Sequence, residues 1–171
     1  MFNKNLKIVI AALIFAWAVY QFIEGNIGNG IALIFLAAFF IFLYFRNEFI
    51  LLAFLQMRKQ DFEATEKWLD KIKNPEAALI TKQQGYYNYL KGILNSQRNL
   101  TVAEKYFKTA IKLGLSMDYD LAMAKLSLAG IAMQKRRKRE ATSLLAEAKK
   151  LDKQNMLTDQ IKMMQQQLKR I

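Results

Sequence analysis

The sequence predicts an all-α protein in which a two-span transmembrane hairpin precedes a series of short helical pairs. Three observations indicate this fold class. Only 7 of the 171 residues are glycine and 1 is proline, so the chain contains few helix breakers. Two long apolar runs occupy the first 50 residues. Beyond them, small and large apolar residues recur at a spacing of 38 residues.

The two apolar runs are long enough to cross a membrane as helices. They cover residues 6–23 and 31–45, and a span needs about 20 mostly apolar residues, with about 17 as the lower limit. The linker at 24–30 contains three glycines and two asparagines, which suit a tight turn between antiparallel helices. We therefore predict spans at about 6–23 and 30–47, within a hairpin domain of residues 1–48.

Two other interpretations of the first run remain open. In the first, the hairpin is a buried core element of a soluble protein. In the other, Lys4 and Lys7 precede a cleavable signal peptide that ends near Ala16-Trp17-Ala18. The apolar run continues beyond Ala18, and a second span follows at once, which favours the membrane hairpin.

The distribution of basic residues predicts the orientation of the hairpin. Lys4 and Lys7 lie before the first span, and Arg46 and a strongly basic domain follow the second. The turn between the spans carries only Glu24. Because Lys and Arg concentrate on the cytoplasmic side, both termini are expected in the cytoplasm. The absence of cysteine and of a targeting peptide fits a bacterial inner membrane.

Helix-capping patterns place the boundaries of the later helices. Asn74-Pro75-Glu76 has the form of an N-cap, a first-position proline and an acidic first turn. Thr101 and Glu104 have the spacing of a capping box, and Gly114 is a typical helix stop. We expect helices at about 4–23, 30–58, 61–73, 75–96, 101–113, 117–134, 138–152 and 156–169.

The repeat becomes visible when the chain is aligned with itself at a shift of 38 residues. Small side chains at one position and large apolar ones four residues later suit two close-packed helices. Leu90, Gly92, Ala103, Phe107, Ala110 and Leu113 recur as Leu128, Gly130, Ala141, Leu145, Ala148 and Leu151. A weaker earlier copy consists of Leu52, Phe54, Thr65, Leu69, Ile72 and Pro75.

These segments resemble the tetratricopeptide (TPR) repeat family. Residues 100–111 look like the second helix of such a repeat, with a small–aromatic–small pattern, and residues 140–152 and 62–72 are similar. The resemblance implies a short solenoid of about three helix pairs with a C-terminal capping helix, over residues 49–171. The chain departs from the family in its period of 38 rather than 34 residues, in glycines one position late, and in the absence of the closing proline from the second and third repeats.

Members of this family are binding scaffolds, so the resemblance implies a concave groove lined by the first helices. Amide side chains there can bond a peptide backbone, and an aromatic residue can serve as an anchor. The groove positions carried over are Asn88, Tyr89 and Asn95 in one repeat, and Ser127 and Met133 in the next, beside Gly92, Leu126, Gly130 and Gln134. The same residues are equally well explained as ordinary helix-surface and packing residues.

Five consecutive basic residues, Lys135, Arg136, Arg137, Lys138 and Arg139, form the strongest charge feature. The sequence predicts no break between residues 30 and 58, so the spans would hold the later helices along the membrane normal. The basic run, with Arg58, Lys59, Arg98, Lys169 and Arg170, would then form a tip that is remote from the bilayer and faces a soluble or ribosomal partner. A solvated loop that only raises solubility is the alternative.

The composition argues against catalysis. The chain has no histidine and no cysteine, which removes imidazole and thiolate chemistry and the usual metal sites. Asp118 and Asp120 are the nearest pair of carboxylates and are better explained as a helix N-terminal cap. Gly25, Gly28 and Gly30 lie between spans rather than in a phosphate loop. We therefore expect no enzyme, no cofactor, no metal and no small-molecule substrate.

Two classes of function fit these features. The first is a noncatalytic adaptor that holds a cytoplasmic protein or assembly at the inner face of a membrane. The second is a membrane tether for ribosomes or RNA through the basic tip, whose binding would depend steeply on salt. The basic run has no interleaved aromatic residues for base stacking, so sequence-specific RNA recognition is not expected. An accessory subunit of a membrane complex is a third possibility, because alanines in the spans permit close helix packing.

Overall fold

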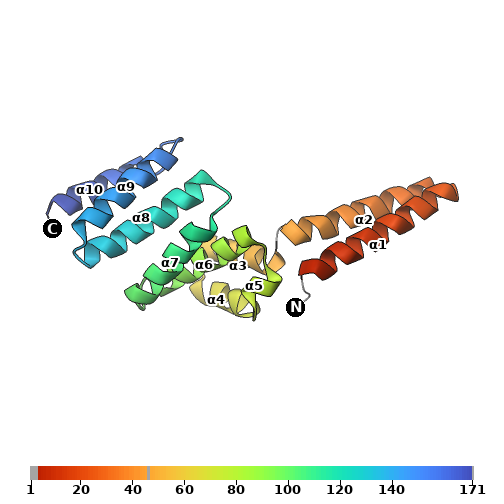
Figure 1. The fold of residues 1–171 in the computed structure, drawn as a ribbon, viewed down its shortest axis with the longest axis horizontal. Coiled ribbons are helices and arrows are strands. Elements are labelled where there is room, and N and C mark those ends of the chain that lie inside the picture. The colour runs from red at the N-terminus through yellow and green to blue at the C-terminus, as the bar shows by residue number, and fades with distance from the viewer. Residues whose placement is uncertain (1–3, 46, 171) are drawn as a thin grey trace. The chain divides into compact units, whose positions relative to one another are not determined.

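The computed structural model describes residues 4–45 and 47–170, and every regular element in these residues is an α-helix (Figure 1). The predicted all-α class is therefore confirmed for the described part of the chain. The helices are α1 (Lys4–Ile23), α2 (Ile27–Phe45), α3 (Glu48–Arg58), α4 (Phe62–Asp70), α5 (Pro75–Ala78), α6 (Thr81–Asn95), α7 (Leu100–Leu113), α8 (Asp118–Gln134), α9 (Lys138–Leu151) and α10 (Thr158–Lys169).

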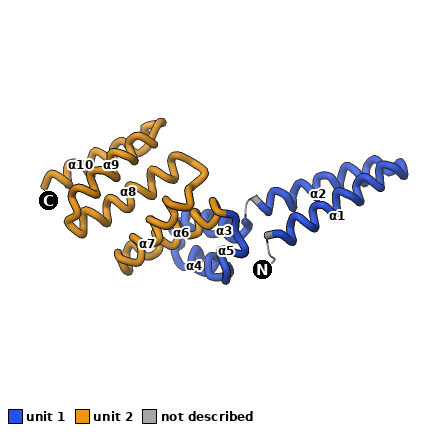
Figure 2. The backbone as a smooth tube through the Cα atoms, in the orientation of Figure 1, with its two compact units in different colours: residues 1–80 blue, residues 81–171 orange. Residues whose placement is uncertain are grey.

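The chain forms two compact units, which Figure 2 colours separately. The first comprises residues 1–80 and contains α1 to α5. The second comprises residues 81–171 and contains α6 to α10. The functional boundary predicted after residue 48 stays a prediction, because these units are defined by packing alone.

Helices α1 and α2 form a hairpin, and each is long and apolar enough to cross a membrane. The qualifying segments are Asn5–Ile23 and Ile27–Tyr44, so the second begins three residues before the predicted start. The connecting turn is also shorter than the predicted 24–30, because α2 already contains Gly28 and Gly30. A side chain at Gly30 would lie 2.8 Å from the Phe22 ring, so this glycine serves close helix packing rather than the turn.

The predicted continuous helix over 30–58 is wrong. Helix α2 ends at Phe45 and α3 begins at Glu48. Asn47 between them is extended (φ −64°, ψ 128°), and its side-chain oxygen accepts a hydrogen bond from the Phe49 backbone N–H at 3.0 Å. Asparagine is a preferred N-cap, and here it starts a new helix. A basic tip far from the bilayer was predicted on the basis of a continuous helix, and the structure does not contain that helix. Arg46, which supported the predicted orientation, lies outside the described residues.

Beyond the hairpin, consecutive helices pack in pairs: α3 with α4, α6 with α7, and α8 with α9. The repeat positions lie inside these pairs. Leu69, Phe107 and Leu145, which are spaced 38 residues apart, are 0%, 0% and 1% exposed. Their small companions Thr65, Ala103 and Ala141 are all 0% exposed. The 38-residue spacing therefore marks the residues that fill the interface within each pair.

Two of the predicted helix boundaries are confirmed. Asn74 caps α5, with its side chain accepting from the Ala77 N–H and Pro75 in the first turn. Gly114 ends α7 with a φ of 83°. The predicted helix over 75–96 is wrong, however, because α5 stops at Ala78 and α6 begins at Thr81. Leu79 between them is extended and fully buried.

Two predicted caps are also wrong. Asn99, not Thr101, caps α7, since its side chain accepts from the backbone N–H groups of Thr101 and Val102. Asn is at least as good an N-cap as Thr, so the helix starts one residue earlier. At α8 the N-cap is Met117, and Asp118 and Asp120 lie in the first helical turn. There they favour the helix through its dipole.

Candidate functional site

The predicted groove residues divide into buried and accessible members. Tyr89 and Met133 are each only 6% exposed, and Met133 belongs to the core shared by α8, α9 and α10. Asn88, Asn95 and Ser127 are partly exposed. The Asn88 side-chain amide donates to the Gln84 carbonyl at 2.7 Å, and that of Asn95 donates to the Lys91 carbonyl at 2.8 Å. The polar members are thus the ones that a ligand can reach.

Tyr89 packs into the interior of the α6–α7 pair. Its ring meets Phe107 edge-on, with the ring centroids 6.1 Å apart. Burial raises the pKa of the Tyr89 hydroxyl, and the negative charge of Asp120 raises it further. Gly92 makes room for this packing, because a side chain there would lie 2.9 Å from the Phe107 ring. Tyr89 and Gly92 therefore belong to the packed side of α6, and the expected aromatic anchor has little accessible surface.

A polar contact joins α6 to the start of α8. The Tyr86 hydroxyl donates to the Asp120 carboxylate at 2.6 Å and accepts from the Ser116 backbone N–H at 3.2 Å. Burial, with the hydrogen bond to Asp120, raises the pKa of Tyr86 to about 12. Tyr86 thus stays protonated at neutral pH and holds the α7–α8 turn against α6. Asp120 therefore has a structural partner in Tyr86.

The basic run 135–139 lies in the turn between α8 and α9. Arg136 has a left-handed conformation (φ 57°), and the turn is closed by hydrogen bonds from the Arg136 N–H to the Met133 carbonyl and from the Arg137 N–H to the Ala132 carbonyl. This pattern is a Schellman motif. The turn between α3 and α4 closes in the same way, with Gln60 at φ 61°. The five basic residues therefore span the end of α8, this turn and the start of α9.

Two of the five basic side chains bind Glu104 on α7. Both Arg137 terminal nitrogens donate to the Glu104 carboxylate, at 2.8 and 2.7 Å. The Lys135 ammonium lies 2.8 Å from the same carboxylate, and the Lys108 ammonium lies 2.7 Å from it. Glu140 completes the cluster at 2.8 Å from Arg137. Lys135 and Arg137 are thus engaged within the unit.

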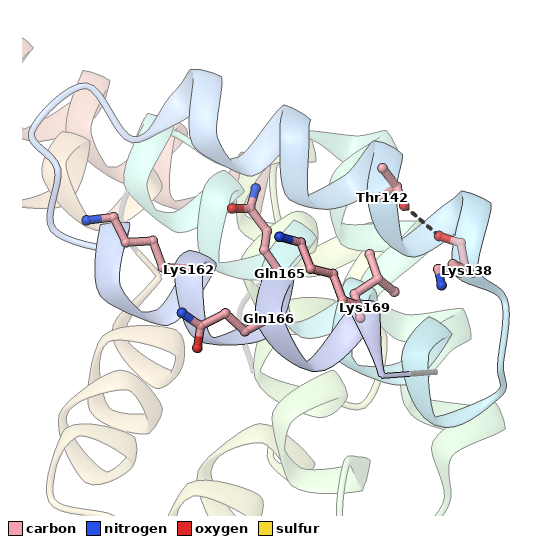
Figure 3. Close-up of a pocket in the computed structure, with 7 residues that line it drawn as sticks. Lys138, Thr142, Lys162, Gln165, Gln166 and Lys169 are labelled. Atoms are coloured by element: carbon pink, nitrogen blue, oxygen red, sulfur yellow. Dashed lines mark hydrogen bonds between the residues drawn. The ribbon is translucent and has the colours of Figure 1, made fainter.

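The remaining three members, Arg136, Lys138 and Arg139, are exposed, as is the predicted tip residue Arg98 in the α6–α7 turn. Lys138 also borders a shallow cavity of about 600 Å³ between α9 and α10. Figure 3 shows its labelled side chains, with the Thr142 hydroxyl donating to the Lys138 carbonyl at 2.8 Å. Lys162, Gln165, Gln166, Leu168 and Lys169 complete the lining. The three lysines make this cavity suitable for an anionic group.

Two arrangements were not predicted from the sequence. The capping-box spacing accounts for Glu104 locally, and nothing in the local pattern indicates that residues 31 and 33 positions later bind it. The Lys71 ammonium lies 3.7 Å from the centroid of the Trp68 ring. The spacing of three residues within one helical turn was a usable signal for that pair.

The comparisons with known proteins leave the site to be interpreted from its geometry. The chain matches no protein-family model, no curated protein and no solved structure. The resemblance to tetratricopeptide repeats therefore rests on the residues that carry it. The accessible features of the described residues are the apolar hairpin, the polar face of the helix pairs and the exposed basic residues.

Proposed function

We propose that this protein is a noncatalytic, membrane-anchored adaptor whose TPR-like helical domain holds a cytoplasmic protein or assembly at the inner face of a membrane. The carrying observation is the exposed apolar surface of the α1–α2 hairpin. Leu13, Phe35 and Phe39 are 66%, 73% and 54% exposed. Apolar surface of this extent favours a lipid environment, and helices satisfy their own backbone groups there.

Repeated local structure supports the TPR-like part of the proposal. Gln60 and Arg136 are 76 positions apart, which is twice the repeat length, and occupy the same place in the same kind of turn. Leu69, Phe107 and Leu145 fill equivalent interfaces. A scaffold of stacked helix pairs presents an extended polar face for a partner. Asn88, Asn95 and Ser127 are the accessible groove residues in this proposal.

The lysine distribution supports an orientation with both termini in the cytoplasm. The absence of cysteine fits the bacterial inner membrane that is part of this proposal. Cysteine labelling tests this topology cleanly, because the chain has no native cysteine. A membrane-impermeant maleimide applied to intact cells should label Asn26→Cys in the hairpin turn. It should label Gln166→Cys on α10 only after lysis. The reverse pattern would contradict the orientation, and release of either variant by alkaline washing would contradict the anchor.

Cross-linking from defined positions tests the adaptor role. Cysteine variants at Asn88, Asn95 and Ser127 would carry a short photoactivated cross-linker in intact membranes. Lys105→Cys and Lys112→Cys, on the exposed surface of α7, serve as matched controls. The adaptor role predicts one common product from the first group and none from the second. Equal products from both groups would show that the groove has no preferred partner.

A tether for RNA or ribosomes is the second candidate, and the exposed Arg136, Lys138 and Arg139 favour it. Binding of this kind neutralises phosphates and weakens steeply with salt. Nuclease treatment of gently solubilised complexes separates the two candidates. Partners that persist after nuclease and at raised salt support the adaptor, whereas ribosomal components that are lost under both conditions support the tether.

A further inference from the structure

The aromatic residues next to the second span form a compact group in the first unit. Phe49, in the first turn of α3, stacks on Trp68 of α4, with ring centroids 6.1 Å apart and planes inclined by 26°. The Lys71 ammonium lies 3.7 Å from the centroid of the Trp68 ring and 6.0 Å from that of Phe49. The three side chains therefore form one unit of two stacked rings capped by a cation.

An ion pair fixes the level of this group relative to the spans. The Lys7 ammonium, only 8% exposed, lies 2.6 Å from the Glu48 carboxylate and donates to the Leu43 carbonyl at 3.3 Å. Lys7 is in the first turn of the α1 span, and Leu43 is in the last turn of the α2 span. Glu48 is therefore held at the end of both apolar segments, and Phe49 is the next residue.

That level corresponds to the lipid headgroups if the hairpin crosses a membrane. The headgroup zone extends about 5–7 Å beyond the hydrocarbon on each side. Tryptophan is enriched at this depth because its ring is apolar and its N–H is polar. Trp68 lies at the level of Phe49, because the two rings stack.

The cavity beside Trp68 is rich in lysine. A shallow cavity of about 650 Å³ is lined by Ala64, Lys67, Trp68, Asp70, Lys71 and Lys73. Its three lysines exceed its single aspartate by two charges. Lys67 also pairs with Glu63 at 2.7 Å, but both side chains are highly exposed, so this pair opens readily. A cavity with this charge next to an interfacial tryptophan is complementary to a lipid phosphate.

We propose that α4 is a membrane-interface anchor in which Trp68 inserts among the headgroups and Lys67, Lys71 and Lys73 bind the phosphate of an anionic phospholipid. This inference rests on the proposed membrane anchoring by α1 and α2. It adds a lipid-binding surface outside the spans, and it sets the depth at which the helical domain begins.

Tryptophan fluorescence of the full chain in lipid nanodiscs tests the proposal. The chain has two tryptophans, so Trp17→Phe leaves Trp68 as the only emitter. Emission would be compared in discs with and without a nitroxide on the headgroup. The proposal predicts strong quenching of Trp68, greater in discs with phosphatidylglycerol than in phosphatidylcholine alone. The triple variant Lys67→Gln/Lys71→Gln/Lys73→Gln should lose this difference, and Lys105→Gln/Lys112→Gln/Lys149→Gln, which removes the same charge from the second unit, should keep it.

Trp17, which is 58% exposed on α1, reports separately on whether the hairpin spans the bilayer. In a Trp68→Phe variant, lipids brominated deep in the acyl chains should quench Trp17 if the hairpin spans the bilayer. One outcome would overturn this inference and leave the anchor intact: brominated lipids quench Trp17, whereas Trp68 is quenched by aqueous iodide and not by the headgroup nitroxide. Absence of Trp17 quenching would overturn both.

Discussion

Arg137 and Glu104 form a two-pronged ion pair that joins the α8–α9 turn to α7. The arginine terminal nitrogens donate to the two carboxylate oxygens at 2.8 and 2.7 Å, and Glu104 is only 9% exposed. A fork of this kind is among the stronger hydrogen-bonded arrangements in proteins. It means that the most basic segment of the chain is partly a structural element that ties one helix pair to the next.

Replacing Glu104 with Gln should destabilise the second unit. Lys108, Lys135 and Arg137 would lose a shared counter-charge in a largely buried position, at a cost of about 1–3 kcal/mol at neutral pH. Thermal unfolding of the full chain in detergent, followed by circular dichroism, measures the effect. Glu147→Gln is the matched control, because Glu147 binds Lys125 but is 44% exposed in its side chain. An equal loss in both variants would contradict the special role of Glu104.

The same cluster predicts a pH dependence. Hydrogen bonds from Arg137, followed by those from Lys108 and Lys135, outweigh burial and hold the pKa of Glu104 well below its ordinary value of 4.5. A carboxylate with a depressed pKa stabilises the fold above the ordinary value and loses this contribution as pH falls below it. The melting-temperature difference between wild type and Glu104→Gln should therefore be largest near neutral pH and shrink below about pH 4.5. A melting-temperature difference that stays constant from neutral pH into this acid range would refute the predicted role of the Glu104 carboxylate.

The five residues of the basic run should fall into two sets with different effects, one on binding to polyanions and one on stability. Arg136→Gln/Lys138→Gln/Arg139→Gln removes exposed charge, so it should lower the salt concentration at which the chain elutes from heparin and leave the melting temperature nearly unchanged. Lys135→Gln/Arg137→Gln removes partners of Glu104, so it should lower the melting temperature. Elution and melting curves of both variants give the comparison. Equal effects of the two sets on both measurements would show that the run acts as a single solvated patch.

Sequence patterns predicted what depends on periodicity. The spacing of Leu69, Phe107 and Leu145 marked the interiors of the helix pairs, because a helix buries one face and that face repeats. The two apolar spans were equally visible. These features are local or periodic, so each segment carries its own signal.

Patterns failed where a local signal is weak or where a partner lies far away in the chain. The cap at Asn47 is local, with a hydrogen bond from the Phe49 N–H, but the apolar residues on both sides of it favour a continuous helix. The repeat predicts Tyr89 as a groove residue, but in the structure it is only 6% exposed and packs against Phe107. Glu104 had a plausible local cap partner, whereas its actual partners come from the α8–α9 turn. Tertiary contacts decide such choices.

Arg136→Gly should stabilise the protein by about 0.5–1 kcal/mol, because glycine adopts the left-handed conformation at this position without the steric cost of a side chain. Arg136 has a φ of 57°. Arg139→Gly removes the same charge from the first turn of α9, where glycine lacks helix propensity, and should destabilise instead. Melting temperatures of the two variants test the sign. A decrease for Arg136→Gly would show that its side chain makes a stabilising contact.

Gly92 and Gly130 occupy equivalent repeat positions but should respond oppositely to alanine. A side chain at Gly92 would lie 2.9 Å from the ring of Phe107, which is fully buried and has no room to move. Gly92→Ala should therefore destabilise by about 1–3 kcal/mol. At Gly130 the nearest atom is the terminal methyl of Met164 at 3.5 Å, an ordinary contact. Gly130→Ala should stabilise by about 0.5–1 kcal/mol through its higher helix propensity.

Thermal unfolding of both variants gives this comparison, and Phe107→Leu supplies the control. A smaller side chain at position 107 leaves space for the Gly92→Ala methyl group, so the double variant should lose less stability than the sum of the two single changes. Strict additivity would mean that the Gly92→Ala cost arises elsewhere. Equal losses at Gly92 and Gly130 would mean that both glycines serve the same close helix approach, as the repeat alone suggests.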